Sequence, residues 1–174
     1  TPFKLGDRYT VFRTNKLRTV KDNLDFGIQH YLVGLLEIVD VKAAFSVAKI
    51  IESYRHMELD DLLMLYEPRS KKIPVIAKKQ GLEGKVVASE EDRAIFADQT
   101  IVFIYKGRQD GVRKGQAYDV YYQKHAKLDS EKDEEILLSP VNFAEIFVLH
   151  TEPTTATAVV TMAEKAIEPG TKFH

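Results

Sequence analysis

Residues 107–122 read Gly107-Arg-Gln-Asp-Gly-Val-Arg-Lys-Gly-Gln-Ala-Tyr-Asp-Val-Tyr-Tyr122 and follow an apolar run at residues 101–105. The second half of the segment, from residue 117 to 122, alternates between two faces as a strand does. An Asp-Gly pair readily adopts the φ > 0 conformations that tight connections require. The segment therefore predicts two strands joined by a structural turn, whose key residues are Gly107, Asp110, Gly111 and Gly115.

A related strand opens the chain as Gly6-Asp-Arg-Tyr-Thr-Val-Phe-Arg13. Further along, residues 34–39 align with residues 144–149, and residues 46–51 align with residues 156–161, both at an offset of 110. An internal repeat of this kind predicts two domains of related structure. We therefore expect an all-β protein with two tandem small β-barrels, SH3-like or OB-like in size. The expected ranges are residues 1–66 for the first barrel, 67–80 for a linker and 81–174 for the second barrel.

Residues 45–54 fit two patterns. As a helix, Phe45, Ala48 and Ile51 would share one face, whereas as a strand the side chains would alternate. The aligned residues 155–161 are rich in Thr and Val, which favour strands. The repeat therefore predicts a strand in both places.

The same patterns predict a core for each domain and several connections. We expect residues 14–29 to form a long loop or irregular hairpin, and residues 124–135 to form an exposed charged loop. Residues 81–88 and 93–96 are expected to be strands around a polar turn that contains Ser89. The predicted core residues are Tyr9, Val11, Leu36, Ile38 and Ile50 in the first domain, and Tyr118, Val120, Ile146, Val148, Ala158 and Val160 in the second.

Composition excludes several classes of protein. The 174 residues carry 25 basic and 26 acidic side chains, so the strongly basic character of many nucleic-acid-binding domains is absent. There is no cysteine, which rules out disulfides and thiolate metal sites. No apolar run reaches the roughly 20 residues that span a bilayer. Because the chain starts at Thr1-Pro2, we expect it to be a piece of a longer protein.

Catalytic and cofactor signatures are weak. His56 and Asp60 stand four residues apart, a spacing that can place two metal ligands on one helical face. The aligned residues Ala166 and Gly170 cannot ligate a metal through side chains, so a polar turn is the preferred interpretation. Neither a Gly-x-Ser-x-Gly nor a Gly-Lys-Ser/Thr motif occurs. We predict no enzyme activity, cofactor or metal site.

Two groups of residues are candidates for ligand contact. The pairs Lys71-Lys72 and Lys78-Lys79 could touch an anionic polymer, although solvated linker lysines are the commoner case. Tyr121 and Tyr122 could stack on sugars or bases, and the alternative is packing within a barrel.

The motifs of both halves resemble one family. Gly6 to Arg13, residues 102–104, the turn from Gly107 to Gly115 and residues 155–161 are similar to the C-terminal region of bacterial envelope proteins that carry an N-terminal LysM peptidoglycan-binding domain. The second half also resembles the C-terminal domain of flagellar assembly protein T. This resemblance implies a location in the cell envelope of a Gram-negative bacterium, in the periplasm, and no enzyme activity. Peptidoglycan would be bound by an upstream LysM domain outside these residues.

Together these observations predict a non-catalytic envelope spacer or protein-interaction module. The alternative is direct binding of a glycan strand or single-stranded nucleic acid by an aromatic and basic sheet face. Because the first domain has few residues before Gly6, it should lack opening strands and expose a sheet edge at residues 8–13. Residues 82–105 or another chain, including a second copy, would then cover this edge.

Overall fold

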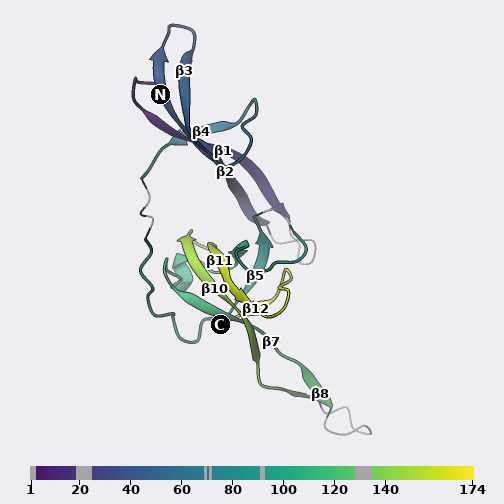
Figure 1. Ribbon diagram of the computed structural model, residues 1–174. Coiled ribbons are helices and arrows are strands. Elements are labelled where there is room, and N and C mark those ends of the chain that lie inside the picture. The colour runs from purple at the N-terminus through teal and green to yellow at the C-terminus, as the bar shows by residue number, and fades with distance from the viewer. Residues whose placement is uncertain (1–2, 19–24, 69, 71, 91–92, 128–134) are drawn as a thin grey trace. The chain divides into compact units, whose positions relative to one another are not determined.

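The computed structural model describes residues 3–18, 25–68, 70, 72–90, 93–127 and 135–174. Strands dominate these residues, and the one helix among them is a single 3-10 turn, η1 (Arg108–Asp110) (Figure 1). The predicted all-β class is therefore confirmed. The chain divides into two compact units, one of Thr1–Leu17 and Gly27–Lys71, the other of Arg18–Phe26 and Lys72–His174.

Among the described residues the first unit forms an open four-stranded sheet, so only the second of the two predicted barrels is observed as a closed barrel. Its strands follow the order β3-β2-β1-β4. Their bounds are β1 (Arg8–Arg18), β2 (Asp25–Val41), β3 (Ser46–Ser53) and β4 (Leu62–Leu65).

The edges of this sheet are β3 and β4, whereas residues 8–13 were expected to be the open edge. Strand β4 covers β1, in a register that runs from Phe12↔Leu62 to Tyr9↔Leu65. The four-residue run Leu-Leu-Met-Leu has no polar alternation, so the sequence pattern did not identify β4 as a strand.

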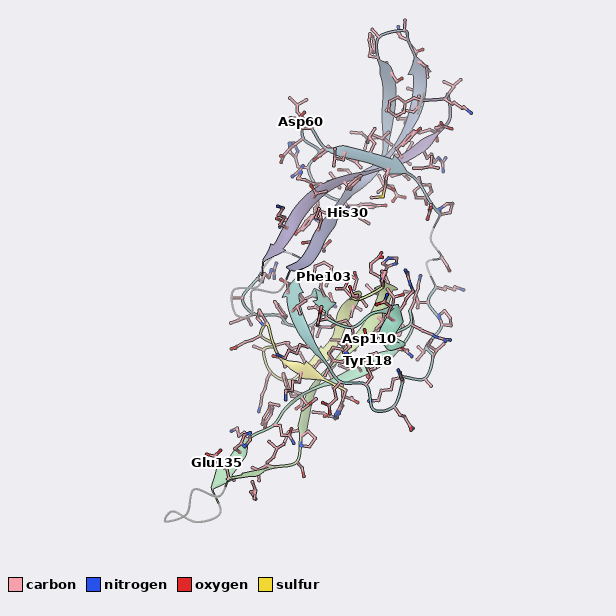
Figure 2. The ribbon with its side chains drawn as sticks, turned by 180° about the vertical axis from the view of Figure 1, so that it is seen from behind. His30, Asp60, Phe103, Asp110, Tyr118 and Glu135 are labelled. Atoms are coloured by element: carbon pink, nitrogen blue, oxygen red, sulfur yellow. The ribbon has the colours of Figure 1, made fainter. Side chains whose placement is uncertain are left out.

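The second unit contains a closed six-stranded barrel with the order β10-β11-β6-β5-β12-β7 (Figure 1). The bounds are β5 (Gly84–Ser89), β6 (Ile101–Ile104), β7 (Ala117–Tyr122), β10 (Val141–Thr151), β11 (Ala156–Ala163) and β12 (Lys172–Phe173). A small hairpin of β8 (His125–Lys127) and β9 (Glu135–Leu137) occupies part of the predicted charged loop. Figure 2 shows Glu135 on this hairpin, away from Tyr118 in the barrel.

The barrel encloses the larger core. Its buried cluster is drawn from residues between Leu82 and Phe173, and it includes all six core residues predicted for the second domain. In the first unit Val11 and Ile38 are buried, while Tyr9 and Leu36 are half-buried. Ile50 is exposed, so its predicted burial is wrong. The reason is that β3, which carries Ile50, is an edge strand with no described strand on its outer side.

Three local predictions have clear outcomes. Residues 45–54 form a strand, as predicted, because β3 spans most of them. Residues 93–96 do not form a strand; Phe96 makes only an isolated bridge with Ile167. Residues 14–29 were expected to form a long loop or an irregular hairpin. Their two ends belong to the neighbouring strands β1 and β2, which agrees with the hairpin alternative and not with a long loop, while residues 19–24 lie outside the described residues.

The hairpins β2–β3 and β10–β11 have the same register. Corresponding pairs are Leu36↔Ile50 with Ile146↔Val160, Ile38↔Ala48 with Val148↔Ala158, and Asp40↔Val47 with His150↔Thr157. Both hairpins shift register at the same two places. Strand β4 also pairs with β1 as β12 pairs with β7, since Leu63 faces Val11 and Phe173 faces Val120. The first sheet thus has the arrangement of the β11-β10-β7-β12 part of the barrel.

Candidate functional site

The most distinctive surface of the chain is formed by the two edge strands of the first sheet. Every residue of β3 after Ser46 is exposed, and β4 is exposed except at Met64. We call the large apolar side chains on these strands the open edges. They are Val47, Ile50 and Ile51 on β3, and Leu62, Leu63 and Leu65 on β4.

The barrel shows why the open edges are exposed. Ile50 is 56% exposed, whereas Val160 at the matching register position is 0% exposed. Leu63 is 40% exposed, whereas the matching Phe173 is 0% exposed. In the barrel, β6 lies beside β11 and β5 lies beside β12, and the described first sheet has neither neighbour. Unprotected sheet edges that carry apolar side chains are typical of surfaces that associate with another chain.

A charged contact fixes the loop before β4. Arg13 donates from Nε to Asp61 Oδ1 at 2.6 Å and from Nη2 to Oδ2 at 3.0 Å. The backbone N–H of Glu58 donates to the same carboxylate at 2.8 Å. The Arg13 guanidinium, followed by this backbone hydrogen bond, holds the pKa of Asp61 below its usual range. This contact connects β1 with the loop and so orients β4 at its edge.

The two residues considered as metal ligands, His56 and Asp60, lie in the loop before β4 and are not arranged as a metal site. His56 accepts a hydrogen bond from Arg13 Nη2 through its backbone carbonyl at 3.4 Å, and Asp61 is occupied by the same guanidinium. Asp60 lies in the loop with φ +71°, as the preferred turn interpretation requires (Figure 2). Within the ranges that the structure describes, no group of three or more His, Cys, Asp or Glu side chains is placed to hold a metal ion.

The predicted turn residues of the second unit have structural contacts. Asp110 accepts hydrogen bonds from Gly107 N at 3.0 Å and from Lys106 Nζ at 2.8 Å, and Gly111 has φ +93°. The two flanking strands are not paired with each other, because β6 pairs with β5 and β11 while β7 pairs with β10 and β12. The turn therefore connects distant parts of the barrel and does not close a hairpin.

Gly115 and Gly6 occupy matching positions. Both have positive φ, +95° and +84°, and their N–H groups donate to Val148 O and Ile38 O, each at 2.9 Å. A Cβ at Gly115 would overlap the carbonyl of Pro74, whereas Gly6 faces open space. Both glycines therefore have a structural role, because they allow the backbone conformation of these turns.

Two of the four candidate lysines hold the linker on the barrel unit. Lys78 Nζ lies 2.5 Å from Asp119 Oδ2 and 3.2 Å from the carbonyl of His174. Lys79 Nζ donates to the carbonyl of Asp110 at 2.7 Å. Lys72 is exposed, and Lys71 lies outside the described residues.

The two candidate tyrosines differ in access. Tyr121 is buried and stacks on His174 with ring centroids 4.6 Å apart. Tyr122 is half-buried, with Lys165 Nζ 4.5 Å and Lys124 Nζ 5.8 Å from its ring centroid. These contacts leave only the Tyr122 ring partly accessible to a stacking ligand.

The fold and this surface define a nearly all-β protein whose described residues form a closed barrel, an open four-stranded sheet and a small two-stranded hairpin. No protein family matches the sequence, and no curated protein matches it. Among the described residues there is no helix with the length and apolar character needed to cross a membrane.

Proposed function

We propose that this chain is a non-catalytic protein-interaction module, and that the open edges of its first sheet are the docking surface. One observation carries the proposal: Ile50 and Leu63 are exposed at positions that are fully buried in the barrel of the same chain. Removing apolar surface from water contributes about 25 cal/mol per Å². A partner that covers the open edges would therefore gain both apolar burial and strand pairing.

We place this module in the cell envelope of a Gram-negative bacterium, in the periplasm. The support is the resemblance of its turn and strand motifs to envelope proteins with an N-terminal LysM domain. In that setting an upstream LysM domain would bind peptidoglycan, and the present chain would act as a spacer that presents its docking surface.

Direct polymer binding is the weaker proposal. It requires accessible aromatic rings beside unpaired basic side chains. Lys78 and Lys79 contact acceptors on the barrel unit, and Tyr121 is buried. The ammonium groups of Lys78 and Lys79 therefore already have protein partners, and one of the two candidate rings is withdrawn from solvent.

Site-specific photo-crosslinking tests the docking surface. A photoreactive amino acid would replace Ile50, and the purified protein would be incubated with an envelope extract of the source bacterium. The matched control carries the same amino acid at Ile95, an exposed isoleucine of the second unit. We expect a crosslinked protein at Ile50 that excess unlabelled chain suppresses, and none at Ile95.

Two results would contradict the proposed function. One is equal crosslinking at Ile50 and Ile95, which would mean that the open edges have no special affinity for protein. The other is retention of the isolated chain on purified peptidoglycan, or saturable binding of a labelled oligonucleotide, which would favour polymer binding.

A further inference from the structure

Two strands close the barrel of the second unit. Strand β6 lies beside β11, with Val102 opposite Ala158, and strand β5 lies beside β12, with Gly84 opposite Phe173. Strands β5 and β6 also pair with each other, so they form an antiparallel two-stranded element between β11 and β12. This element covers one side of the barrel core.

The first sheet has counterparts of the other four strands. Strands β3, β2, β1 and β4 correspond to β11, β10, β7 and β12, in the same neighbour order. The directions also agree, because β2–β3 and β1–β4 are antiparallel like β10–β11 and β7–β12. Two antiparallel strands therefore have the right directions to join β3 to β4, as β5 and β6 join β12 to β11.

Hydrogen bonds outside the hairpins support this correspondence. Tyr9 Oη donates to Asp7 Oδ2 at 3.4 Å, and Tyr118 Oη donates to Gln116 Oε1 at 2.8 Å, 109 residues later. Glu58 N donates to the Asp61 side chain at 2.8 Å, and Glu168 N donates to the Thr171 side chain at 3.2 Å, 110 residues later. The match between the two units thus includes the turns that position β1 and β4.

The side chains at the gap have the chemistry of a barrel interior. Ala48 and Ile50 match Ala158 and Val160, and Leu63 matches Phe173. All three barrel residues are fully buried, whereas Ala48, Ile50 and Leu63 are exposed. The first sheet therefore carries apolar side chains where a covering element would bury them.

We propose that the first sheet binds an antiparallel β-hairpin of a partner polypeptide, which pairs with β3 and β4 and completes a six-stranded barrel. This inference rests on the proposed function and names the partner's chemistry. The hairpin should carry small or β-branched apolar residues at alternate, inward positions, as Val86, Val102 and Ile104 do in the second unit. Main-chain pairing supplies affinity and these side chains supply specificity.

A second copy of the chain is a poorer donor of this hairpin. Each copy carries one β5–β6 element, and its residues Val86, Val102 and Ile104 are 0% exposed in the copy's own barrel. Donating the element would open that barrel and expose its core. A hairpin from a different polypeptide avoids this loss.

A graft tests whether the gap accepts such a hairpin. Residues 82–105 would be duplicated ahead of Thr1 through a flexible Gly/Ser linker of about 10 residues. We expect amide exchange in β3 and β4 to slow by about tenfold or more, because edge amides would become paired. In the matched control the grafted copies of Val86, Val102 and Ile104 are replaced by Asp, and exchange should stay at the level of the unmodified chain.

Three outcomes separate this inference from its alternatives. Unchanged β3 and β4 exchange in the grafted chain would overturn the hairpin proposal. Sedimentation of the ungrafted chain as a dimer with protected β3 and β4 amides would overturn it in favour of a second copy. If a protein is crosslinked at Ile50 but the graft does not insert, the docking function is supported and only the hairpin proposal is wrong. If no protein is crosslinked at Ile50, the proposed function itself is wrong.

Discussion

At the scale of single residues, two carboxylates organise the turns of the two units. Asp61 is held by Arg13 in the first unit, and its side chain is only 5% exposed. Asp110 is held by Lys106 and by the Gly107 N–H in the second unit. In both cases the hydrogen bond from the basic side chain is the main cause of a lowered pKa.

The lowered pKa of Asp61 predicts how the first unit responds to acid. The folded-state pKa lies below the unfolded value of about 3.9, so the stabilisation is present above that value. It is lost as the pH falls through the folded-state pKa. We therefore expect Asp61→Asn to lower the urea midpoint of the first unit at pH 7, with a difference that shrinks as the pH falls below the unfolded value of about 3.9.

Asp60→Asn is the matched control for that experiment. It removes a carboxylate from the neighbouring position, and asparagine tolerates the positive φ found there. Urea titrations at several pH values, followed through the amide signals of β1 and β4, give the measurement. A difference for Asp61→Asn that does not vary with pH would contradict the role of the Arg13 contact.

The glycine pair at Gly6 and Gly115 gives a second prediction at this scale. Gly115→Ala should destabilise the second unit by about 1–3 kcal/mol, because it combines positive φ with overlap of the Pro74 carbonyl. Gly6→Ala should cost the first unit about 1–2 kcal/mol, because only the backbone conformation is affected. Urea denaturation of both variants measures the losses. A smaller loss for Gly115→Ala than for Gly6→Ala would show that the linker contact is unimportant.

At the scale of elements, the linker is partly a component of the second unit. Ile76 N donates to the carbonyl of Gly115 at 2.9 Å, and the buried Gln116 side chain donates to the carbonyl of Ala77 at 3.1 Å. Gln116 Oε1 also accepts from Arg113 N at 2.7 Å. The second half of the predicted linker at residues 67–80 is thus fastened to the segment directly before β7.

Replacement of Gln116 tests this attachment. Gln116→Ala leaves the buried Tyr118 hydroxyl and the Ala77 carbonyl without this partner, so we expect a loss of about 1–3 kcal/mol. Amide exchange at Ile76 should become faster. Asp7→Ala is the matched control, because Asp7 holds the equivalent turn of the first unit through Lys4 N and Tyr9 Oη. An effect of Asp7→Ala on Ile76 exchange, or none of Gln116→Ala, would contradict the assignment.

At the scale of the whole molecule, the two units differ in how completely they bury their apolar residues. The buried cluster of the barrel is drawn entirely from residues 82–173. Among the described residues, the first unit buries fewer large side chains and exposes most of those on β3 and β4. Closure removes the edges of a sheet, and an open sheet keeps them.

This difference predicts that the fragment Lys72–His174 folds by itself. Its core needs no residue from the first unit, so its amide NMR spectrum should be dispersed and should overlay that of the same residues in the whole chain. The fragment with residues 1–71 should bind a hydrophobic dye more strongly than the barrel fragment does. A collapsed spectrum for the barrel fragment would show that the second unit depends on the first.

Much of the fold could be predicted from local patterns. The alternation of Tyr118 and Val120 identified β7, and the alignment of residues 46–51 with residues 156–161 resolved the helix–strand ambiguity of β3. The candidate surface could be predicted less well. The expected open edge at residues 8–13 was wrong because Leu62–Leu65 pairs with it, a contact between residues 50 to 56 positions apart.

The sequence by itself determined the all-β class, most strands, and the positive φ of Gly111 in its Asp-Gly turn, because these depend on residues close together in the chain. Only the tertiary structure decided which sheet closes. Similar registers occur in both units, yet Val160 is buried and Ile50 is exposed. The difference is that two further strands, β5 and β6, join the edges of the sheet in the second unit, and no described strands do so in the first. The alternation of residues within β3 or β11 cannot predict this pairing, because it depends on strands elsewhere in the sequence.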